Sequence, residues 1–117
     1  MNKTIDDLTN KLRRFAKERD WEQFHSPKNL SMALAVEAGE ILEIFQWLTQ
    51  EESQKLDGKR LERVKEEMGD VMIYLVRLSD CLGISLLEAA FEKLERNQNK
   101  YPIEKARGNA KKYTEFD

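Results

Sequence analysis

The strongest constraint on the fold is a long apolar stripe in the second half of the chain. Between residues 61 and 82, apolar side chains recur in alternating steps of three and four over about three heptads. They are Leu61, Val64, Met68, Val71, Leu75, Leu78 and Leu82. Because an α-helix has about 3.6 residues per turn, this spacing places them on one helical face. We therefore predict an amphipathic helix from about Lys59 to Leu82, ended by Gly83.

Three further segments show helical spacing. The chain of 117 residues holds only 5 Gly and 2 Pro, and 36% of its residues are charged, which favours long solvated helices over a sheet. The three segments run from about Ile5 to Arg19, from about Asn29 to Gln50 and from about Leu86 to Lys100. Their expected N-caps are Thr4 with Asp7 as a capping box, Ser26 or Asn29, and Ser85, and Pro102 stops the last helix.

These four helices predict one all-α domain over residues 1–117, an antiparallel four-helix bundle. The polar, basic tail over residues 103–117 is expected to be extended and to pack on the bundle or on a neighbouring subunit. Apolar residues off the main stripes suggest that a second copy covers part of the surface. These residues are Val36, Ile44, Met72 and Ile73. We therefore expect a homodimer or a homotetramer.

Composition excludes several classes of partner. Acidic residues number 22 and Lys plus Arg 20, a net charge of −2, which argues against nucleic-acid binding. The single cysteine, Cys81, cannot form an internal disulfide, which favours a reducing compartment. The start of the chain, MNKTIDDLTNK, has no apolar signal core, and no run reaches the length of a membrane helix. We expect a soluble, cytoplasmic protein without nucleic-acid or membrane partners.

Acidic residues three apart lie on one helix face, but their spacing alone carries no information here. Random placement of 22 acids in 117 positions gives about four such pairs, and four are present. They are Glu37/Glu40, Glu40/Glu43, Glu67/Asp70 and Glu92/Glu95. The position of each pair relative to the apolar stripe of its helix must therefore distinguish a site from a solvated surface.

A helical wheel at about 100° per residue separates these pairs. Glu37 falls inside the apolar arc of its helix and Glu40 at the edge of that arc, and Glu67 and Asp70 lie on the apolar side of the next helix. The Glu92/Glu95 pair projects away from its stripe. Converging carboxylates require protons or a cation, and hard oxygen ligands suit Mg²⁺ or Mn²⁺. The hypothesis is a divalent-metal site, and the alternative is a bundle edge with ordinary surface acids.

Aromatic residues lie beside these acids. His25 follows Trp21 and Phe24 in a loop, where it either packs and caps or helps to form a flat pocket for an aromatic ligand. Trp47 lies one turn beyond Glu43, and Tyr74 one turn beyond Asp70. Core packing explains a single aromatic, whereas two beside the same acids suggest a wall on which a base stacks. A basic region from Lys93 to Tyr113 is either a solvated tail or a phosphate-binding segment.

Taken together, these segments resemble the all-α nucleotide pyrophosphohydrolases of the MazG type, and in particular their dCTP pyrophosphatase branch. Glu37-Ala-Gly-Glu40 followed by Glu67-Met-Gly-Asp70 is similar to the ExxE…ExxD signature of that family. Further matching stretches are RDWEQFH (19–25), Asn29-Leu30, EAGEILEIFQW (37–47), EEMGDVMIYLV (66–76), NQNKYP (97–102), Arg107-Gly108 and KYTE (112–115). Some relatives of this branch carry a polar residue facing the base on the first helix, where this chain has Leu12.

The resemblance implies Mg²⁺-dependent hydrolysis of a nucleoside triphosphate, such as dCTP or a modified dCTP, to the monophosphate and pyrophosphate. Mn²⁺ is an alternative cation. Metal binding and catalysis are assigned to Glu37, Glu40, Glu67 and Asp70, and we expect Glu40 to orient or deprotonate the attacking water. Base and sugar are placed near Trp21, His25, Trp47 and Tyr74. Phosphate contacts or pocket walls at a subunit boundary are assigned to Lys93, Asn97, Lys100, Tyr101, Arg107, Lys112 and Tyr113.

The implied role is house-cleaning of the nucleotide pool by an oligomer, commonly a dimer of dimers. Three alternatives remain open from the sequence. The first is a related phosphohydrolase acting on another nucleotide, such as phosphoribosyl-ATP. The second is a non-catalytic helical protein that binds partners through its heptad faces. The third is a protein that binds a nucleotide without hydrolysing it, against which the intact acids at all four signature positions argue.

Overall fold

The computed structural model describes residues 3–117, which form helices and connecting loops without a strand. The chain divides into two compact units, one ending at Ile84 and the other beginning at Ser85. The first unit contains α1 (Ile5–Glu18), η1 (Glu22–Phe24), α2 (Pro27–Phe45), α3 (Gln50–Ser53) and α4 (Gly58–Leu82). The second contains α5 (Leu86–Lys100), α6 (Ile103–Ala106) and η2 (Tyr113–Glu115). Among the described residues, no helix is long and apolar enough to cross a membrane.

The helix boundaries are set by local caps, as the sequence predicts. The Thr4 hydroxyl accepts a hydrogen bond from the Asp7 amide, and the Asp7 carboxylate accepts one from the Thr4 amide, which completes the capping box of α1. The hydroxyls of Ser26 and Ser85 cap α2 and α5. Gly83 ends α4 in the left-handed region, with φ of 67°. The helices predicted over residues 5–19, 59–82 and 86–100 are therefore confirmed.

The second helix is shorter than predicted. It ends at Phe45, and the separate short helix α3 starts at Gln50. The cause is a capping box at Thr49, whose hydroxyl accepts from the Glu52 amide while the Glu52 carboxylate accepts from the Thr49 amide. This local pairing stabilises a new helix start at a position where continuous apolar spacing predicted an unbroken helix.

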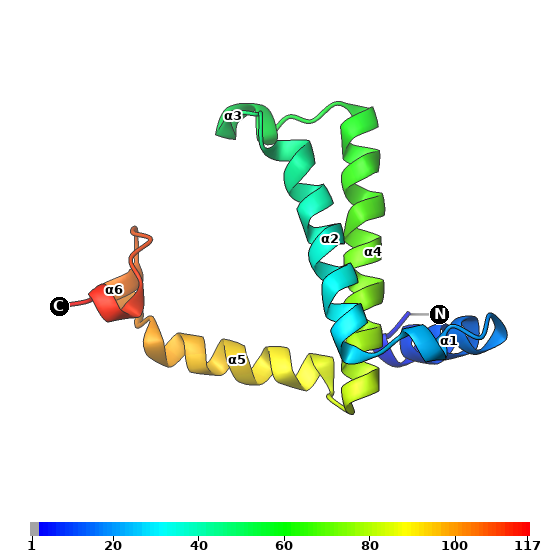
Figure 1. Ribbon diagram of the computed structural model, residues 1–117. Coiled ribbons are helices and arrows are strands. Elements are labelled where there is room, and N and C mark those ends of the chain that lie inside the picture. Colours follow the sequence, from blue (N-terminus) through cyan, green and yellow to red (C-terminus); the bar gives the residue numbers. More distant parts are fainter. Residues whose placement is uncertain (1–2) are drawn as a thin grey trace. The chain divides into compact units, whose positions relative to one another are not determined.

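Helices α2 and α4 lie side by side and run in opposite directions (Figure 1). Two contacts show this register, because His25 meets Arg77 near one end of α4 and Glu37 meets Glu67 nearer the other. The core of this unit is formed by Ala16, Leu30, Ile44, Val64 and Val76, all buried. Helix α1 packs on the C-terminal half of α4 (Figure 1). Burial of these apolar side chains is the main contribution to the stability of the first unit.

Only part of the long stripe of α4 is covered within the chain. Val64 is buried, whereas Leu61 and Met68 are each 58% exposed. Of the four apolar residues off the main stripes, Ile44 is buried and Ile73 half-buried, and Val36 and Met72 are exposed. The packed long helices of the first unit are α1, α2 and α4, while α5 belongs to the second unit. The four-helix bundle and the homo-oligomer therefore stay predictions.

In the second unit the tail folds back on the end of α5. The ring of Tyr101 packs edge-on against Tyr113, with centroids 6.0 Å apart, and against Phe116 at 5.7 Å. Lys100 Nζ lies 4.8 Å from the centroid of Tyr113. The tail carries the two short helices α6 and η2 where an extended conformation was expected, because these aromatic contacts hold it.

Candidate metal centre and adjoining pocket

The antiparallel packing of α2 and α4 brings the signature acids together. Carboxylate oxygens of Glu37, Glu67 and Asp70 all lie within 4.8 Å of one another. Glu40 is within hydrogen-bonding reach of both Glu37 and Glu67. The pairs Glu37/Glu40 and Glu67/Asp70 are 27 or more residues apart in the sequence. They meet at one level of the two helices because the two acids of each pair, three residues apart, lie on the face toward the other helix.

Two oxygens in this cluster are buried and unpaired. Within residues 3–117, Glu37 Oε2 and Glu67 Oε2 are inaccessible to solvent and have no hydrogen-bond partner. None of the ion pairs in the described part of the chain involves these acids. A buried carboxylate oxygen without a partner destabilises the fold unless a proton or a cation binds to it.

The pKa shifts of these acids also favour binding of a proton or a cation. The pKa of Glu67 is raised, first by its hydrogen bond with Glu37 and then by burial and the charges of Glu37 and Asp70. The pKa of Glu40 is raised, first by its hydrogen bond with Glu67. For Glu37, the contact with Glu67 lowers the pKa. Burial, the contact and charge of Glu40, and the charge of Asp70 outweigh that effect, so the pKa of Glu37 is raised overall. Repulsion among these carboxylates therefore favours neutralisation.

The donor set fits a hard divalent cation. Every donor is a carboxylate oxygen, without nitrogen or sulfur, which is the ligand chemistry that Mg²⁺ and Mn²⁺ prefer over Zn²⁺. The unpaired oxygens of Glu37 and Glu67 are the atoms that such an ion would satisfy. The cluster is thus an acidic group suited to a divalent metal, as the sequence hypothesis proposed.

The cluster gives metal-free protein a specific pH dependence. Because the folded pKa of Glu67 lies above its ordinary value of 4.5, the stabilising effect of its proton is complete below pH 4.5 and is lost as pH rises through the folded pKa. We expect Glu67→Gln, measured by urea unfolding in chelator, to be more stable than wild type, with a larger advantage at pH 7 than at pH 5. The exposed neighbour Glu66 provides the control Glu66→Gln. An advantage of equal size at both pH values would contradict the prediction.

A pocket opens directly beside Asp70. It has a volume of about 290 Å³, close to the lower end of the range for small-molecule sites at about 300 Å³. Its lining residues are Leu12, Phe15, Ala16, Trp21, His25, Asp70, Ile73, Tyr74 and Arg77, from α1, the loop after it and α4. Because Asp70 belongs to both the acidic cluster and the pocket wall, a ligand in the pocket lies next to the candidate metal centre.

The pocket wall is predominantly aromatic. The ring of Trp21 packs edge-on against Phe15, with centroids 5.6 Å apart, and against His25 at 6.4 Å. Tyr74 enters the wall from α4, one turn after Asp70. Flat apolar surfaces with a few polar groups suit a planar heteroaromatic ligand. Three of the four residues that the sequence assigned to the base therefore lie together.

One residue assigned to the base does not line this pocket. Trp47 follows the end of α2, does not line the pocket and is 87% exposed. The residues assigned to phosphate contacts all belong to the second unit, and their role stays a prediction. They are Lys93, Asn97, Lys100, Tyr101, Arg107, Lys112 and Tyr113. Within that unit, the nearby charge of Lys100 is the main cause that lowers the pKa of Lys93. Two neighbouring cations of this kind suit an anionic ligand.

Sequence reasoning missed Arg77. It is only 7% exposed, it lines the pocket and its guanidinium contacts the His25 ring. A signal was present, since Arg77 follows Asp70 and Tyr74 on the same face of α4 and stands between the apolar residues Val76 and Leu78. A charged residue in such a position is rarely buried without a specific partner.

The chain is similar to several known proteins. Residues 32–116 match the model of the MazG-like family. The chain is similar to dCTP pyrophosphatase 1 of Mus musculus, with 42% identity over 97% of this chain and 68% of that protein. The human protein of the same name is 43% identical over the same shares. A crystal structure of a pyrophosphatase from Archaeoglobus fulgidus is also similar, with a TM-score of 0.81 and 39% identity, covering 87% of this chain and 95% of that one.

Proposed function

The chain belongs to the MazG-like family, and from this premise we propose that it hydrolyses dCTP, or a modified dCTP, to the monophosphate and pyrophosphate with the help of Mg²⁺. The prediction of a nucleoside triphosphate pyrophosphohydrolase is confirmed by the family match and by the similar pyrophosphatases. A non-catalytic interaction protein is thereby set aside. The observation that carries the proposal is the carboxylate cluster, with its unpaired oxygens, directly beside an aromatic pocket.

In this proposal Glu37, Glu67 and Asp70 hold the divalent ion, with Glu40 as the fourth acid. When bound, such a cation would neutralise the charge of the triphosphate and polarise the attacked phosphoryl group. Without such a cation, four carboxylates would repel a substrate that is itself strongly anionic. A bound cation would thus reconcile a cluster of buried, unpaired carboxylate oxygens with an anionic substrate.

The pocket binds the base. The rings of Trp21 and Tyr74 and the apolar side chains around them bury its faces and exclude water. Because Asp70 lies at the junction of pocket and cluster, a base in the pocket directs its triphosphate towards the acids. Holding the reacting groups in place is itself a large contribution to catalysis. A phosphate-binding role for the basic residues of the second unit stays a prediction.

Glu40 is proposed to accept the proton of the attacking water. Its carboxylate adjoins Glu37 and Glu67 but is not one of the three whose oxygens converge. The water oxygen forms a bond to the α-phosphorus, the bond from that phosphorus to the bridging oxygen breaks, and pyrophosphate leaves with the bonding electron pair. The proton of the water moves to a Glu40 carboxylate oxygen. A Glu40→Gln protein with wild-type turnover would contradict this assignment.

The decisive assay is pyrophosphate release from a panel of canonical and modified nucleoside triphosphates, with and without Mg²⁺ or Mn²⁺. We expect release from dCTP or a modified dCTP, dependent on the cation. Preferential turnover of phosphoribosyl-ATP would favour the related phosphohydrolase instead. Absence of release from every compound would overturn the proposal. Assembly as a homodimer or homotetramer and a cytoplasmic, house-cleaning role stay predictions beside it.

A further inference from the structure

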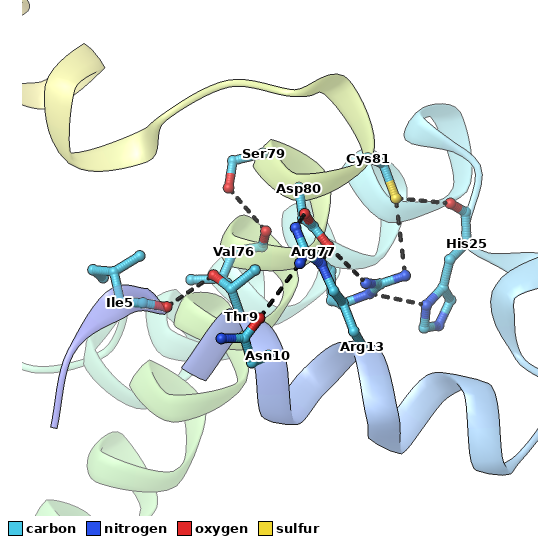
Figure 2. A network of polar contacts seen from close by, with 10 residues as sticks. All are labelled: Ile5, Thr9, Asn10, Arg13, His25, Val76, Arg77, Ser79, Asp80 and Cys81. Carbon is cyan, nitrogen blue, oxygen red and sulfur yellow. Dashed lines mark hydrogen bonds and ion pairs between the residues drawn. The ribbon is translucent and has the colours of Figure 1, made fainter. Parts of the chain in front are cut away.

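Arg77 lines the pocket and makes three side-chain contacts (Figure 2). Its Nε donates a hydrogen bond to Nδ1 of His25 at 3.4 Å. Its Nη1 pairs with Asp80 Oδ2 at 3.3 Å, and its Nη2 lies 3.9 Å from Cys81 Sγ. The guanidinium is thus fixed from α4 while it faces the one histidine of the chain.

The chemistry of these two groups determines where the histidine carries its proton. A guanidinium has five N–H donors and no acceptor, so the His25 nitrogen it contacts must offer a lone pair. A neutral imidazole with a lone pair on Nδ1 carries its proton on Nε2. Burial, followed by the positive charge of Arg77, lowers the pKa of His25, so the ring is neutral at pH 7.

The surrounding contacts hold this arrangement in place. Cys81 Sγ donates to the backbone carbonyl of His25 at 3.4 Å, which ties the loop to α4 (Figure 2). On the other side, Arg13 Nε donates to Asp80 Oδ2 at 2.8 Å, so the carboxylate that holds Arg77 is itself held from α1. His25 lines the pocket, and its Nδ1 edge is taken by Arg77, which leaves the Nε2 edge for a ligand.

We propose that Arg77 is a positioning residue that fixes His25 as the Nε2–H tautomer, so that the pocket presents a hydrogen-bond donor to a ring carbonyl oxygen of the base. That the ligand is a base rests on the proposed function. The tautomer of His25 rests only on its contact with Arg77. A donor held in one tautomer discriminates between a base with a carbonyl at that edge and one without. Free exchange between tautomers would blur this discrimination.

Nitrogen-15 NMR of the labelled, full-length protein tests the tautomer directly, because the chain has a single histidine. The spectrum is recorded near pH 7 without nucleotide or metal. We expect a protonated Nε2 and an unprotonated Nδ1. A protonated Nδ1, or an averaged pair of signals, would overturn the inference. Since this readout does not involve turnover, the tautomer can hold while the proposed activity fails, and the reverse is also possible.

Variants then test the role of Arg77. Arg77→Met removes the donor and is expected to give mixed tautomers and a KM for dCTP about tenfold higher, with little change in kcat. Arg77→Lys restores a donor and is expected to recover the Nε2–H tautomer. Arg63→Met changes an exposed arginine of the same helix that contacts neither His25 nor Asp80, so it is the matched control and keeps the tautomer. If Arg77→Met does not fold, the wild-type spectrum and Arg77→Lys decide. An unchanged tautomer and KM in a folded Arg77→Met protein would contradict the proposal.

Discussion

Replacing Glu37 with Gln is expected to reduce pyrophosphate release by about 100-fold or more while the protein stays folded. Glu37 supplies one of the three converging oxygens, and its Oε2 is buried without a partner. An amide has nearly the same shape but lacks the charge that binds a cation. The substitution therefore weakens metal binding and lowers the activity that depends on the metal.

The same substitution is expected to raise the thermal midpoint of metal-free protein, because it removes one of several repelling carboxylates. Addition of Mg²⁺ or Mn²⁺ is expected to raise the midpoint of wild type, since a ligand that binds only the folded state stabilises it. The variant should gain much less. Thermal melts in chelator and in a series of cation concentrations, together with the pyrophosphate assay, measure all three effects.

The matched control is Glu92→Gln on α5. Glu92 belongs to an acidic pair of the same spacing, but it is exposed and outside the converging cluster. We expect wild-type turnover and an unchanged response to Mg²⁺. If Glu37→Gln retained turnover and cation stabilisation, the cluster would be an ordinary acidic surface, which is the alternative that the sequence left open.

The helices and the acidic cluster were predictable because both depend on local rules. A capping residue and the spacing of apolar side chains are read within one or two turns, so α1, α4 and α5 begin and end close to the predicted residues. The four signature acids were separated from the other pairs by their angle on the wheel, which also follows from local geometry. The break between α2 and α3 depends on Thr49 and Glu52, a local pair that the apolar pattern concealed.

Contacts between distant segments could not be predicted in the same way. The pairing of Arg77 with His25 joins residues 52 positions apart, and that of Arg13 with Asp80 joins residues 67 apart. No periodicity connects such residues, because the contact arises only when a loop and two helices have packed. Trp47 shows the same limit, since its nearness to the acids along α2 did not bring it into the pocket.

Asp80→Asn is expected to lower the free energy of unfolding by about 3 kcal/mol, the range for breaking a buried ion pair by removing one partner. Asp80 accepts from both Arg13 and Arg77, and its side chain is 15% exposed. Without this carboxylate, the buried Arg77 loses its counter-charge and must remain charged in a largely apolar environment. Urea unfolding at pH 7 measures the loss.

An exposed ion pair on the same helix provides the control. Glu62 and Lys65 lie 3.9 Å apart with both side chains more than 60% exposed, so Glu62→Gln is expected to change the stability by less than about 0.5 kcal/mol. A similar small change for Asp80→Asn would mean that Arg77 does not depend on Asp80.

The pH dependence distinguishes a lost charge from a lost shape. The hydrogen bond from Arg13 is the main cause that lowers the pKa of Asp80 below its ordinary value of 3.8. Its stabilising contribution is therefore present above pH 3.8 and disappears as pH falls through the lowered folded pKa. The difference between wild type and Asp80→Asn should be largest near neutral pH and shrink on acidification. A difference in stability that stays constant down to the acid transition would instead mean that Asp80 acts through packing. It would contradict the prediction that Arg77 needs the negative charge of Asp80.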